Sequence, residues 1–360
     1  MNMDAQLGKR IQLLDCAIKS WLQPDNKELS RAIEATVDEG HFSFSDVKHR
    51  ILSLKTSLTE KNITKWALRS NCFPDAATNK KILCLHAGNL PLVGMNDFLA
   101  IVLTGGDYFG KLSGKDPYLL PTLINKSVDI GVIEDTHVNT DLTDFESVQA
   151  DAVLFAGSKR SVPEVQRKLR ELRITDSDTP QLIRTAHYSI AWIHDADSST
   201  FEPLAEAVLR YGGKGCRSVA IVIAPYSLKS NVCTFTDYIE QFWLHNPQHD
   251  KPPASLLHRF AHNKAVGINQ SWLDDFLIEE TIEHPEENFI LYWVEGGKTE
   301  IEEIIQKYGQ GLQSIYSTGE YIGEKIGDQL IEPLEEAQNP PVWWQPDGVD
   351  TISWIQEAVT

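Results

Sequence analysis

The apolar positions of the chain follow two different spacings. Over the first 70 residues they recur every three or four positions, as at Ile11, Leu14 and Ile18, which predicts amphipathic helices. After Pro74, short apolar runs alternate with helix-like patterns, which predicts βαβ units and a parallel sheet. The runs expected to form strands are 81–87, 99–103, 128–133, 151–156, 189–193 and 219–224.

The connecting segments carry signals for where helices begin and end. Ser161 and Glu164 have the spacing of a capping box, so a helix is expected to start there. Another helix, over 201–211, is expected to stop at Gly212 and Gly213. The later elements are expected to be a strand at 289–294, a helix at 300–308 and a weak strand at 313–317.

A charged turn at 194–198 marks the expected domain boundary, and 360 residues suffice for two separate cores. We therefore predict an α/β protein. Its helical N-terminal region and nucleotide-binding domain would occupy 1–195, and a catalytic domain 196–330. Prolines between 340 and 346 exclude a regular helix at those positions, so 331–360 is expected to be an extended C-terminal arm.

The composition narrows the class of protein. With 51 acidic and 33 basic residues the net charge is −18, which repels phosphate backbones and argues against a nucleic-acid partner. No run approaches the roughly 20 apolar residues of a membrane span, and the N-terminal helix lacks the pattern of a signal peptide. The five cysteines follow no framework spacing, so reduced thiols and a cytoplasmic location are expected.

Cys216 is the candidate nucleophile. It lies in Gly213-Lys214-Gly215-Cys216-Arg217, between the end of a predicted helix and the start of a strand, where functional residues often lie. The glycines let the backbone approach a substrate, and the flanking cations would favour the thiolate, which is the nucleophilic form. A small buried residue at the start of a core strand is the alternative interpretation.

Polar residues follow two of the predicted strands. Asn89 comes after the strand at 81–87, so we expect it at the carboxyl end of a parallel strand, where open α/β sheets bind ligands. Its amide could donate to an oxyanion. Lys111 and Ser113 could hold a nucleotide ribose or phosphate. Ordinary turns are the alternative interpretation of both segments.

Gly157 and Ser158 join a predicted strand to the capped helix. The N–H groups and dipole of that helix, with the bases Lys159 and Arg160, suit a pyrophosphate. The glycine fingerprint of ordinary dinucleotide sites does not follow the strand, and the chain has no Walker A sequence.

Two pairs of histidines could suggest a metal. They are His245 with His249, and His258 with His262. Neither pair is accompanied by the further ligands or the glutamate of a zinc motif, so we expect no catalytic metal.

Taken in order, these segments resemble the LuxC-type acyl-CoA reductase family of the aldehyde dehydrogenase superfamily. The resemblance covers roughly residues 75–355 and implies an aldehyde-dehydrogenase-like fold, with a cofactor-binding parallel-sheet domain and an α/β catalytic domain. The matching segments are G-N-x-P-L-V-G at 88–94, K-x-S-x-K-D at 111–116, G-S at 157–158, G-x-G-C-R at 213–217 and D-G-V-D-T at 347–351.

The resemblance also implies roles for single residues. Cys216 would accept the acyl group, and Asn89 with the Cys216 N–H would form the oxyanion hole. The residues that would bind the cofactor are Lys111, Ser113, Gly157, Ser158 and Glu280.

One departure from the superfamily bears on the reaction. Aldehyde-oxidising members carry an E-L-G-G segment whose glutamate activates water, whereas the matching stretch 182–186 has no acid. Without that base a thioester intermediate should persist long enough to accept hydride. Gly114 and Lys115 stand where NAD-preferring relatives often have an acid, which favours NADPH and permits NADH.

Together these patterns predict an oxidoreductase of fatty-acid metabolism. It would use NAD(P)H to reduce an acyl-CoA, or an acyl-carrier thioester, to the aldehyde through an S-acyl-cysteine. One alternative is a cysteine-dependent acyltransferase or thioesterase that uses no nicotinamide. The other is a non-catalytic acyl-binding partner. A homo-oligomer or a partner protein for acyl transfer is compatible with either kind of enzyme.

Overall fold

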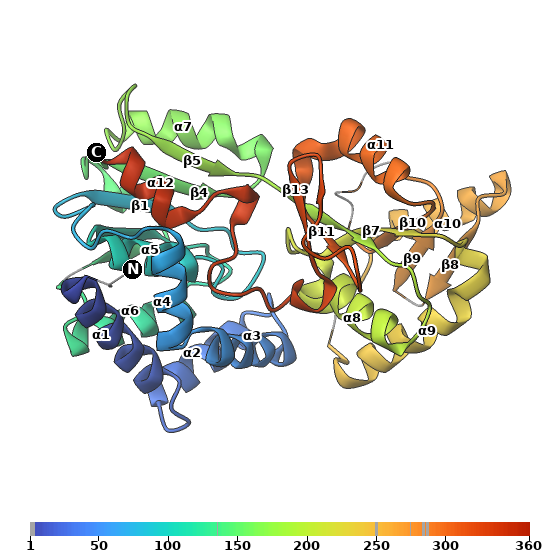
Figure 1. Cartoon of the computed structure of the whole chain (residues 1–360), viewed down its shortest axis with the longest axis horizontal. Coiled ribbons are helices and arrows are strands. Elements are labelled where there is room, and N and C mark those ends of the chain that lie inside the picture. The colour runs from blue at the N-terminus through green and yellow to red at the C-terminus, as the bar shows by residue number, and fades with distance from the viewer. Residues whose placement is uncertain (1–3, 135, 249–250, 274, 283–284, 286–287) are drawn as a thin grey trace. The chain divides into compact units, whose positions relative to one another are not determined.

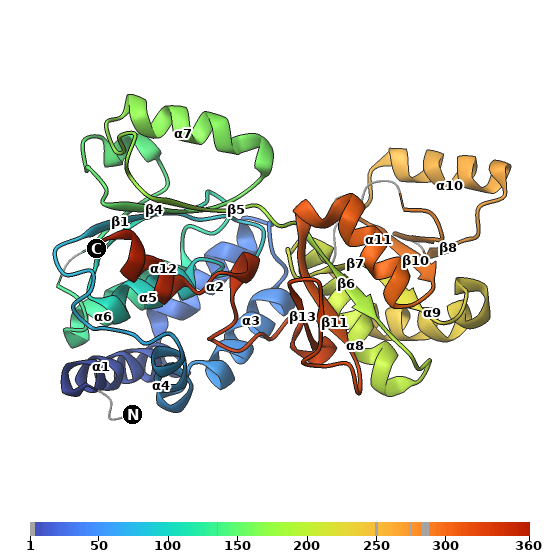
Figure 2. The same cartoon turned by 45° about the horizontal axis from the view of Figure 1, so that its top comes forward.

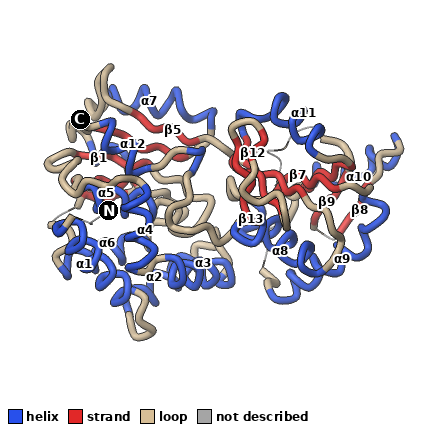
Figure 3. The backbone as a smooth tube through the Cα atoms, viewed as in Figure 1, coloured by secondary structure: helices blue, strands red, loops and turns tan. Residues whose placement is uncertain are grey.

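In the computed structural model, helices and strands alternate along the chain, which divides into two units (Figure 1). The structure describes residues 4–134, 136–248, 251–273, 275–282, 285 and 288–360. One unit contains Met1–Thr185 and Pro340–Thr360, and the other contains Ala186–Asn339. Figure 3 shows strands inside each unit with helices around them, so the fold class is α/β, as predicted.

The described part of the chain before the first strand is helical, as the apolar spacing predicts (blue in Figure 1). Its helices are α1 (Ala5–Trp21), α2 (Lys27–Asp38), α3 (Phe44–Ser57) and α4 (Glu60–Arg69). Each begins after a polar residue whose side chain accepts hydrogen bonds from N–H groups of the first turn. These capping residues are Asp4, Asn26, Ser43 and Thr59.

The first unit is built on a parallel sheet. Its strands are β1 (Lys81–Leu85), β2 (Asp107–Lys111), β3 (His137–Asn139), β4 (Ala152–Ala156) and β5 (Gln181–Arg184). Their order is β3-β2-β1-β4-β5, and neighbouring strands pair in parallel. The winding direction reverses between β1 and β4, and ligands bind outside the carboxyl ends of the strands at such a switch point. The loops after β1, β2 and β4 therefore lie where a ligand is expected.

Helices cover both faces of this sheet (Figure 2). α7 (Val162–Glu171) lies over one face, where Leu169 shares an apolar core with Leu83 and Val153. The helices over the other face are α5 (Met95–Thr104), α6 (Leu119–Ile130) and α12 (Thr351–Ala358).

Most of the predicted strands in both units are confirmed, and two are wrong. The confirmed ones correspond to β1, β4, β6 (Tyr188–Trp192) and β7 (Val219–Ala224). The run 99–103 lies instead in α5, which is buried on nearly every side and therefore shows no polar face. The run 128–133 covers the end of α6, which stops at Gly131 with φ 77°. The strand between these helices is β2, which the apolar pattern did not predict.

The second unit contains a larger sheet with the order β12-β13-β11-β6-β7-β10-β9-β8. Its further strands are β8 (Gln270–Leu273), β9 (Phe276–Glu279), β10 (Ile290–Glu295), β11 (Leu312–Ser317), β12 (Lys325–Ile326) and β13 (Gln329–Pro333). The helices on one face are α8 (Ser198–Leu209) and α9 (Leu228–His245), and those on the other are α10 (Ala254–Val266) and α11 (Lys298–Tyr308) (Figure 2). The elements predicted for 201–211, 289–294, 300–308 and 313–317 are confirmed by α8, β10, α11 and β11.

The border between the units differs from the predicted one. The chain passes into the second unit at Ala186, before the charged turn at 194–198. β6 pairs with β7 and β11, so this strand belongs to the second sheet and the border must precede it. The chain returns to the first unit at Pro340 and ends in α12, so 331–360 is not one extended arm.

The D-G-V-D-T element fastens the C-terminal segment to the first unit. The Asp350 carboxylate accepts hydrogen bonds from Trp66 Nε1 at 3.2 Å and from Ser70 Oγ at 2.9 Å. The Thr351 hydroxyl accepts one from the Arg184 guanidinium at 2.7 Å. This element thus serves the tertiary structure of the unit.

Candidate functional site

Cys216 lies in a tight turn that precedes the amino end of β7. The Ser218 N–H donates to the Gly215 carbonyl oxygen at 2.9 Å, which closes the turn around Cys216. Ser189, on β6, donates through Oγ to the Cys216 carbonyl oxygen at 3.0 Å. Cys216 itself is half-buried, between the buried residues Gly215 and Arg217.

The backbone before Cys216 needs glycine. Tyr211, Gly212 and Gly213 have φ values of 58°, 67° and 69°, which is the left-handed region that glycine tolerates best. A Cβ on Gly213 would lie 3.0 Å from the Val208 carbonyl oxygen. The positive φ values of these glycines therefore let the chain reverse direction between the end of α8 and the tight turn at Cys216.

The two cations beside Cys216 lie in different environments. Lys214 is partly exposed, whereas Arg217 is buried with 5% exposure. Burial raises the pKa of Tyr316 well above its usual value, and the charge of Arg217 opposes that rise. Arg217 thus acts on the buried groups of the sheet, and Lys214 is the more accessible cation.

Asn89 follows β1, which lies between β2 and β4. The prediction that it comes after a parallel strand, at its carboxyl end, is confirmed. Asn89 is half-buried. It therefore stands beside the switch point of the sheet with part of its surface accessible.

The loop that carries Asn89 is packed closely at both of its glycines. A Cβ on Gly88 would overlap Ser113 Oγ, and one on Gly94 would overlap the His86 ring. The ring is buried, and its Nε2 lies 2.7 Å from the Tyr108 hydroxyl. Burial lowers the pKa of His86 to about 4, so the ring is neutral at physiological pH. Both glycines of G-N-x-P-L-V-G are thus explained by packing.

Asp116 joins the same loop to the K-x-S-x-K-D segment. Its Oδ2 accepts a hydrogen bond from the Leu92 N–H at 2.6 Å, and its exposure is 7%. Burial raises the pKa of Asp116 to about 6, while the N–H groups of Leu92 and Leu119 oppose the rise. In the same segment, the Lys115 N–H donates to Ser113 Oγ at 3.2 Å. Nothing in the sequence pattern distinguishes Asp116 from a solvated turn acid.

Lys111 points to the face of the sheet that α7 covers. Phe109 packs on that face, and alternate residues of a strand point to the same side. The Thr143 N–H lowers the pKa of Asp141, and the charges of Lys111 and Lys168 add to the effect. Positive charge from β2 and α7 therefore gathers around Asp141.

Gly157 and Ser158 follow β4, on the other side of the switch point from Asn89. The Gly157 N–H donates to the Arg184 carbonyl oxygen at 3.1 Å, and Ser158 is exposed. In this described segment the predicted capping box at Ser161 is wrong, because the Ser161 side chain caps no N–H. Its hydroxyl donates instead to the Ser158 carbonyl oxygen at 2.7 Å.

Glu280 follows β9 and holds the start of α9. Its Oε1 accepts a hydrogen bond from the Leu228 N–H at 2.9 Å, and its Oε2 accepts one from the Asn269 amide at 2.7 Å. β9 and β10 run parallel to β7, so Glu280 lies toward the carboxyl ends of these strands. Cys216 precedes the amino end of β7, so the second sheet does not bring the two residues together. In the first unit, by contrast, Asn89 and four of the cofactor candidates, Lys111, Ser113, Gly157 and Ser158, lie at or after the carboxyl ends of three neighbouring strands.

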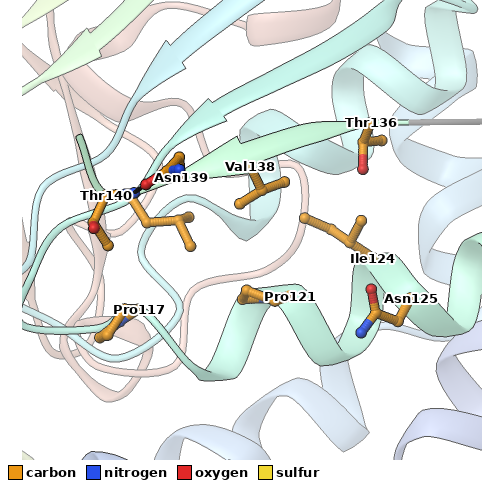
Figure 4. A pocket seen from close by; sticks show the side chains of 9 residues that line it. Pro117, Pro121, Ile124, Asn125, Thr136, Val138, Asn139 and Thr140 are labelled. Atoms are coloured by element: carbon orange, nitrogen blue, oxygen red, sulfur yellow. Dashed lines mark hydrogen bonds between the residues drawn. The ribbon is translucent and has the colours of Figure 1, made fainter. Parts of the chain in front are cut away.

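A cavity of about 440 Å³ lies in the first unit, between α6 and β3 and beside the loop that follows β2. Figure 4 shows Pro121 and Ile124 of α6 facing Val138 of β3. Its lining residues are Leu112, Pro117, Pro121, Ile124, Asn125, Thr136, Val138, Asn139 and Thr140. None of these described residues is charged, so the cavity offers no cation to a phosphate.

Among the described residues, no group of three or more His, Cys, Asp or Glu side chains could hold a metal ion. Of the histidine pairs, His258 and His262 lie on α10, and His249 lies outside the described residues. Within the same part of the chain, none of the helices combines the length and the apolar character needed to cross a membrane.

The fold is that of the aldehyde dehydrogenases. Aldehyde dehydrogenase 21 from Physcomitrella patens, in complex with succinate, has a TM-score of 0.59 at 10% identity, over 87% of this chain and 74% of that one. Succinic semialdehyde dehydrogenase from Streptococcus pyogenes, in complex with NADP+, has a TM-score of 0.58 at 14% identity, over 93% of this chain and 79% of that one.

The chain is similar in sequence to long-chain acyl-protein thioester reductase 2 from Photobacterium leiognathi. The two are 32% identical over 68 residues, which is 19% of this chain and 14% of that protein. No family profile matches the chain.

Proposed function

We propose that the protein is an NAD(P)H-dependent reductase that converts an acyl thioester into the aldehyde. The observation that carries this proposal is Cys216, a half-buried thiol held in a tight turn on an aldehyde dehydrogenase fold. The short match to a long-chain acyl-protein thioester reductase supports an acyl thioester as the substrate class. Coenzyme A and a carrier protein are the two thiols that could bring the acyl group.

In the proposed reaction the Cys216 thiolate attacks the carbonyl carbon of the thioester. A new C–S bond forms, the bond to the leaving thiol breaks, and that thiolate takes up a proton. The roles that the family resemblance implies would make the Cys216 N–H and the Asn89 amide the donors to the oxygen that becomes negative. A bound reduced nicotinamide would supply the hydride that brings the acyl carbon to the oxidation level of an aldehyde. Cys216 then leaves as the thiolate and the aldehyde is released.

The first unit offers groups that suit a dinucleotide. Lys111 supplies positive charge on the α7 side of the sheet, and Ser113 lies in the loop after the same strand. A Cβ at Gly157 would overlap the Phe155 ring, so this position requires glycine. The next residue, Ser158, is exposed. These residues would hold the ribose and phosphates. The proposal does not depend on Glu280.

The end of β5 supports reduction over hydrolysis. Arg184 is buried, and its guanidinium donates to the Asp97 carboxylate at 2.6 Å. The described stretch 182–186 contains no acid that could deprotonate a water molecule. An S-acyl intermediate on Cys216 would therefore wait for hydride.

The proposal is tested by replacing Cys216. Cys216→Ala should abolish both labelling by radioactive acyl-CoA and the oxidation of NADPH or NADH that acyl-CoA causes. Cys233→Ala, at an exposed thiol of the same unit, is the matched control and should change neither. Labelling that persists in Cys216→Ala would refute the nucleophile. Labelling of the wild type without oxidation of either cofactor would favour an acyltransferase or thioesterase.

A further inference from the structure

We infer that Asp116 is a positioning residue that fixes the loop carrying Asn89 in its working conformation. This inference rests on the proposed function, in which the Asn89 amide donates to the oxyanion. Asp116 would not touch the substrate, and it would act on the reaction through Asn89.

The contact that carries the inference is the hydrogen bond from the Leu92 N–H to Asp116 Oδ2, at 2.6 Å. Leu92 has a φ of 56°, in the left-handed region that a leucine normally avoids. The Leu92 side chain is buried with 1% exposure, so the strained residue cannot relax into solvent. The Leu92 carbonyl oxygen accepts a hydrogen bond from the Met95 N–H at 3.2 Å. The bond to the buried carboxylate adds the stronger restraint, because a bond from an N–H to an ionised acceptor is about twice as strong as a neutral one.

The Asn89 loop is anchored on both sides of Asn89 by one short segment. Before Asn89, Gly88 packs so closely against Ser113 that a Cβ would overlap the hydroxyl. After Asn89, Leu92 is bound by Asp116. The anchoring segment is itself a turn, because the Asp116 N–H donates to the Ser113 carbonyl oxygen at 3.2 Å. Asn89 is therefore held between two contacts that come from a single turn.

The chemistry of the contact explains why a carboxylate suits this position. Asp116 accepts a hydrogen bond from the Leu92 N–H through Oδ2, and its carboxylate offers acceptors alone when it is ionised. An asparagine keeps one acceptor oxygen for Leu92 but presents an NH₂ group on its other side. An alanine offers neither. Asp116→Asn should thus keep part of the function that Asp116→Ala loses.

The kinetic test is a double-mutant cycle at pH 8 with acyl-CoA and NADPH. We expect Asp116→Ala to lower kcat by roughly 10–100-fold, within the cost of losing one oxyanion donor, with little change in KM for either substrate. In the Asn89→Ala background the same change should cost less than about 2-fold, because residues that act as a unit are not additive. Asp116→Asn should recover part of the lost kcat. Equal losses in both backgrounds, or a normal kcat in Asp116→Ala, would overturn the inference.

Hydrogen exchange tests the contact without activity. In the full chain without substrate, the Leu92 amide should exchange faster in Asp116→Ala than in the wild type or Asp116→Asn. Unchanged exchange in Asp116→Ala would overturn the inference. If exchange changes as expected but the wild type reduces no thioester, the proposed function fails and the positioning contact is upheld.

Asp350→Asn is the matched control for both measurements. Asp350 is another partly buried aspartate of the same unit, and it accepts a hydrogen bond from the Ser353 N–H at 2.8 Å. Its replacement should lower stability but leave kcat and the exchange of the Leu92 amide unchanged. A loss of kcat in Asp350→Asn as large as that in Asp116→Ala would show a general effect of destabilisation and would overturn the inference.

Discussion

Replacing Asp97 should strongly destabilise the first unit. Asp97 Oδ1 lies 2.6 Å from Arg184 Nη1, and the two side chains are only 10% and 7% exposed. Asp97→Ala would leave the guanidinium buried beside the Thr351 hydroxyl without a counter-charge. Removing one partner of a buried pair costs about 3–5 kcal/mol, mainly because the remaining charge stays desolvated. The exposed pair Lys126–Asp129, at 3.2 Å, offers a contrast, since such surface pairs contribute about 0–1 kcal/mol.

Hydrogen exchange of peptides from residues 1–185 in increasing urea follows the unfolding of this unit separately from the other. At an m-value of about 2 kcal/mol/M, the expected loss lowers the urea midpoint by about 1.5–2.5 M. Asp129→Ala should lower it by less than about 0.5 M. The double variant Asp97→Leu/Arg184→Met removes both charges and should regain most of the loss. The reasoning is refuted if Asp97→Ala shifts the midpoint no more than Asp129→Ala, or if the double variant is no more stable than the single one.

Two further predictions concern the Cys216 loop and the cofactor. Gly213→Ala should cost about 1–3 kcal/mol of stability and slow acylation, because its φ is 69° and the new Cβ meets the Val208 carbonyl oxygen at 3.0 Å. Gly212→Ala has a similar φ but meets only the Lys214 side chain at 3.6 Å, so a loss as large as that of Gly213→Ala would contradict this account. Lys115→Glu should weaken NADPH binding more than NADH binding in fluorescence titrations, because only NADPH brings a 2′-phosphate to this exposed lysine. A wild-type preference for NADH of about tenfold or more, about 1.4 kcal/mol, would count against that assignment.

The apolar pattern predicted the elements that keep one polar face or that are too short to be helices. α1 shows its spacing because one side meets solvent, and β7 is a run of six apolar residues that ends at Pro225. The pattern failed at α5, since a helix buried all round has no polar positions to reveal its period. It also missed β2, which begins at exposed Asp107 and ends at half-buried Lys111.

The candidate site was predictable as a set of segments but not as a set of contacts. The apolar run before Asn89 suffices to predict that Asn89 lies at the carboxyl end of a strand in a parallel sheet. The bond between Leu92 and Asp116 depends on how two loops meet in space, and no spacing along the chain encodes it. The capping box at Ser161 shows the reverse case, in which a local pattern is present but the hydroxyl finds another acceptor.

The contacts also show which residues of the candidate site the fold itself requires. Gly88, Gly94 and Asp116 have packing or hydrogen-bonding partners that account for their identity, whatever the protein does. The anchors on either side of Asn89 join its loop to the segment 113–116. The turn at Cys216 is closed by the hydrogen bond from the Ser218 N–H to the Gly215 carbonyl oxygen, and Ser189 donates to the Cys216 carbonyl oxygen. Asn89 and Cys216 are both half-buried, so part of each residue is accessible. In the proposed reaction, acyl transfer to Cys216 with the Asn89 amide as oxyanion donor would give both side chains a role.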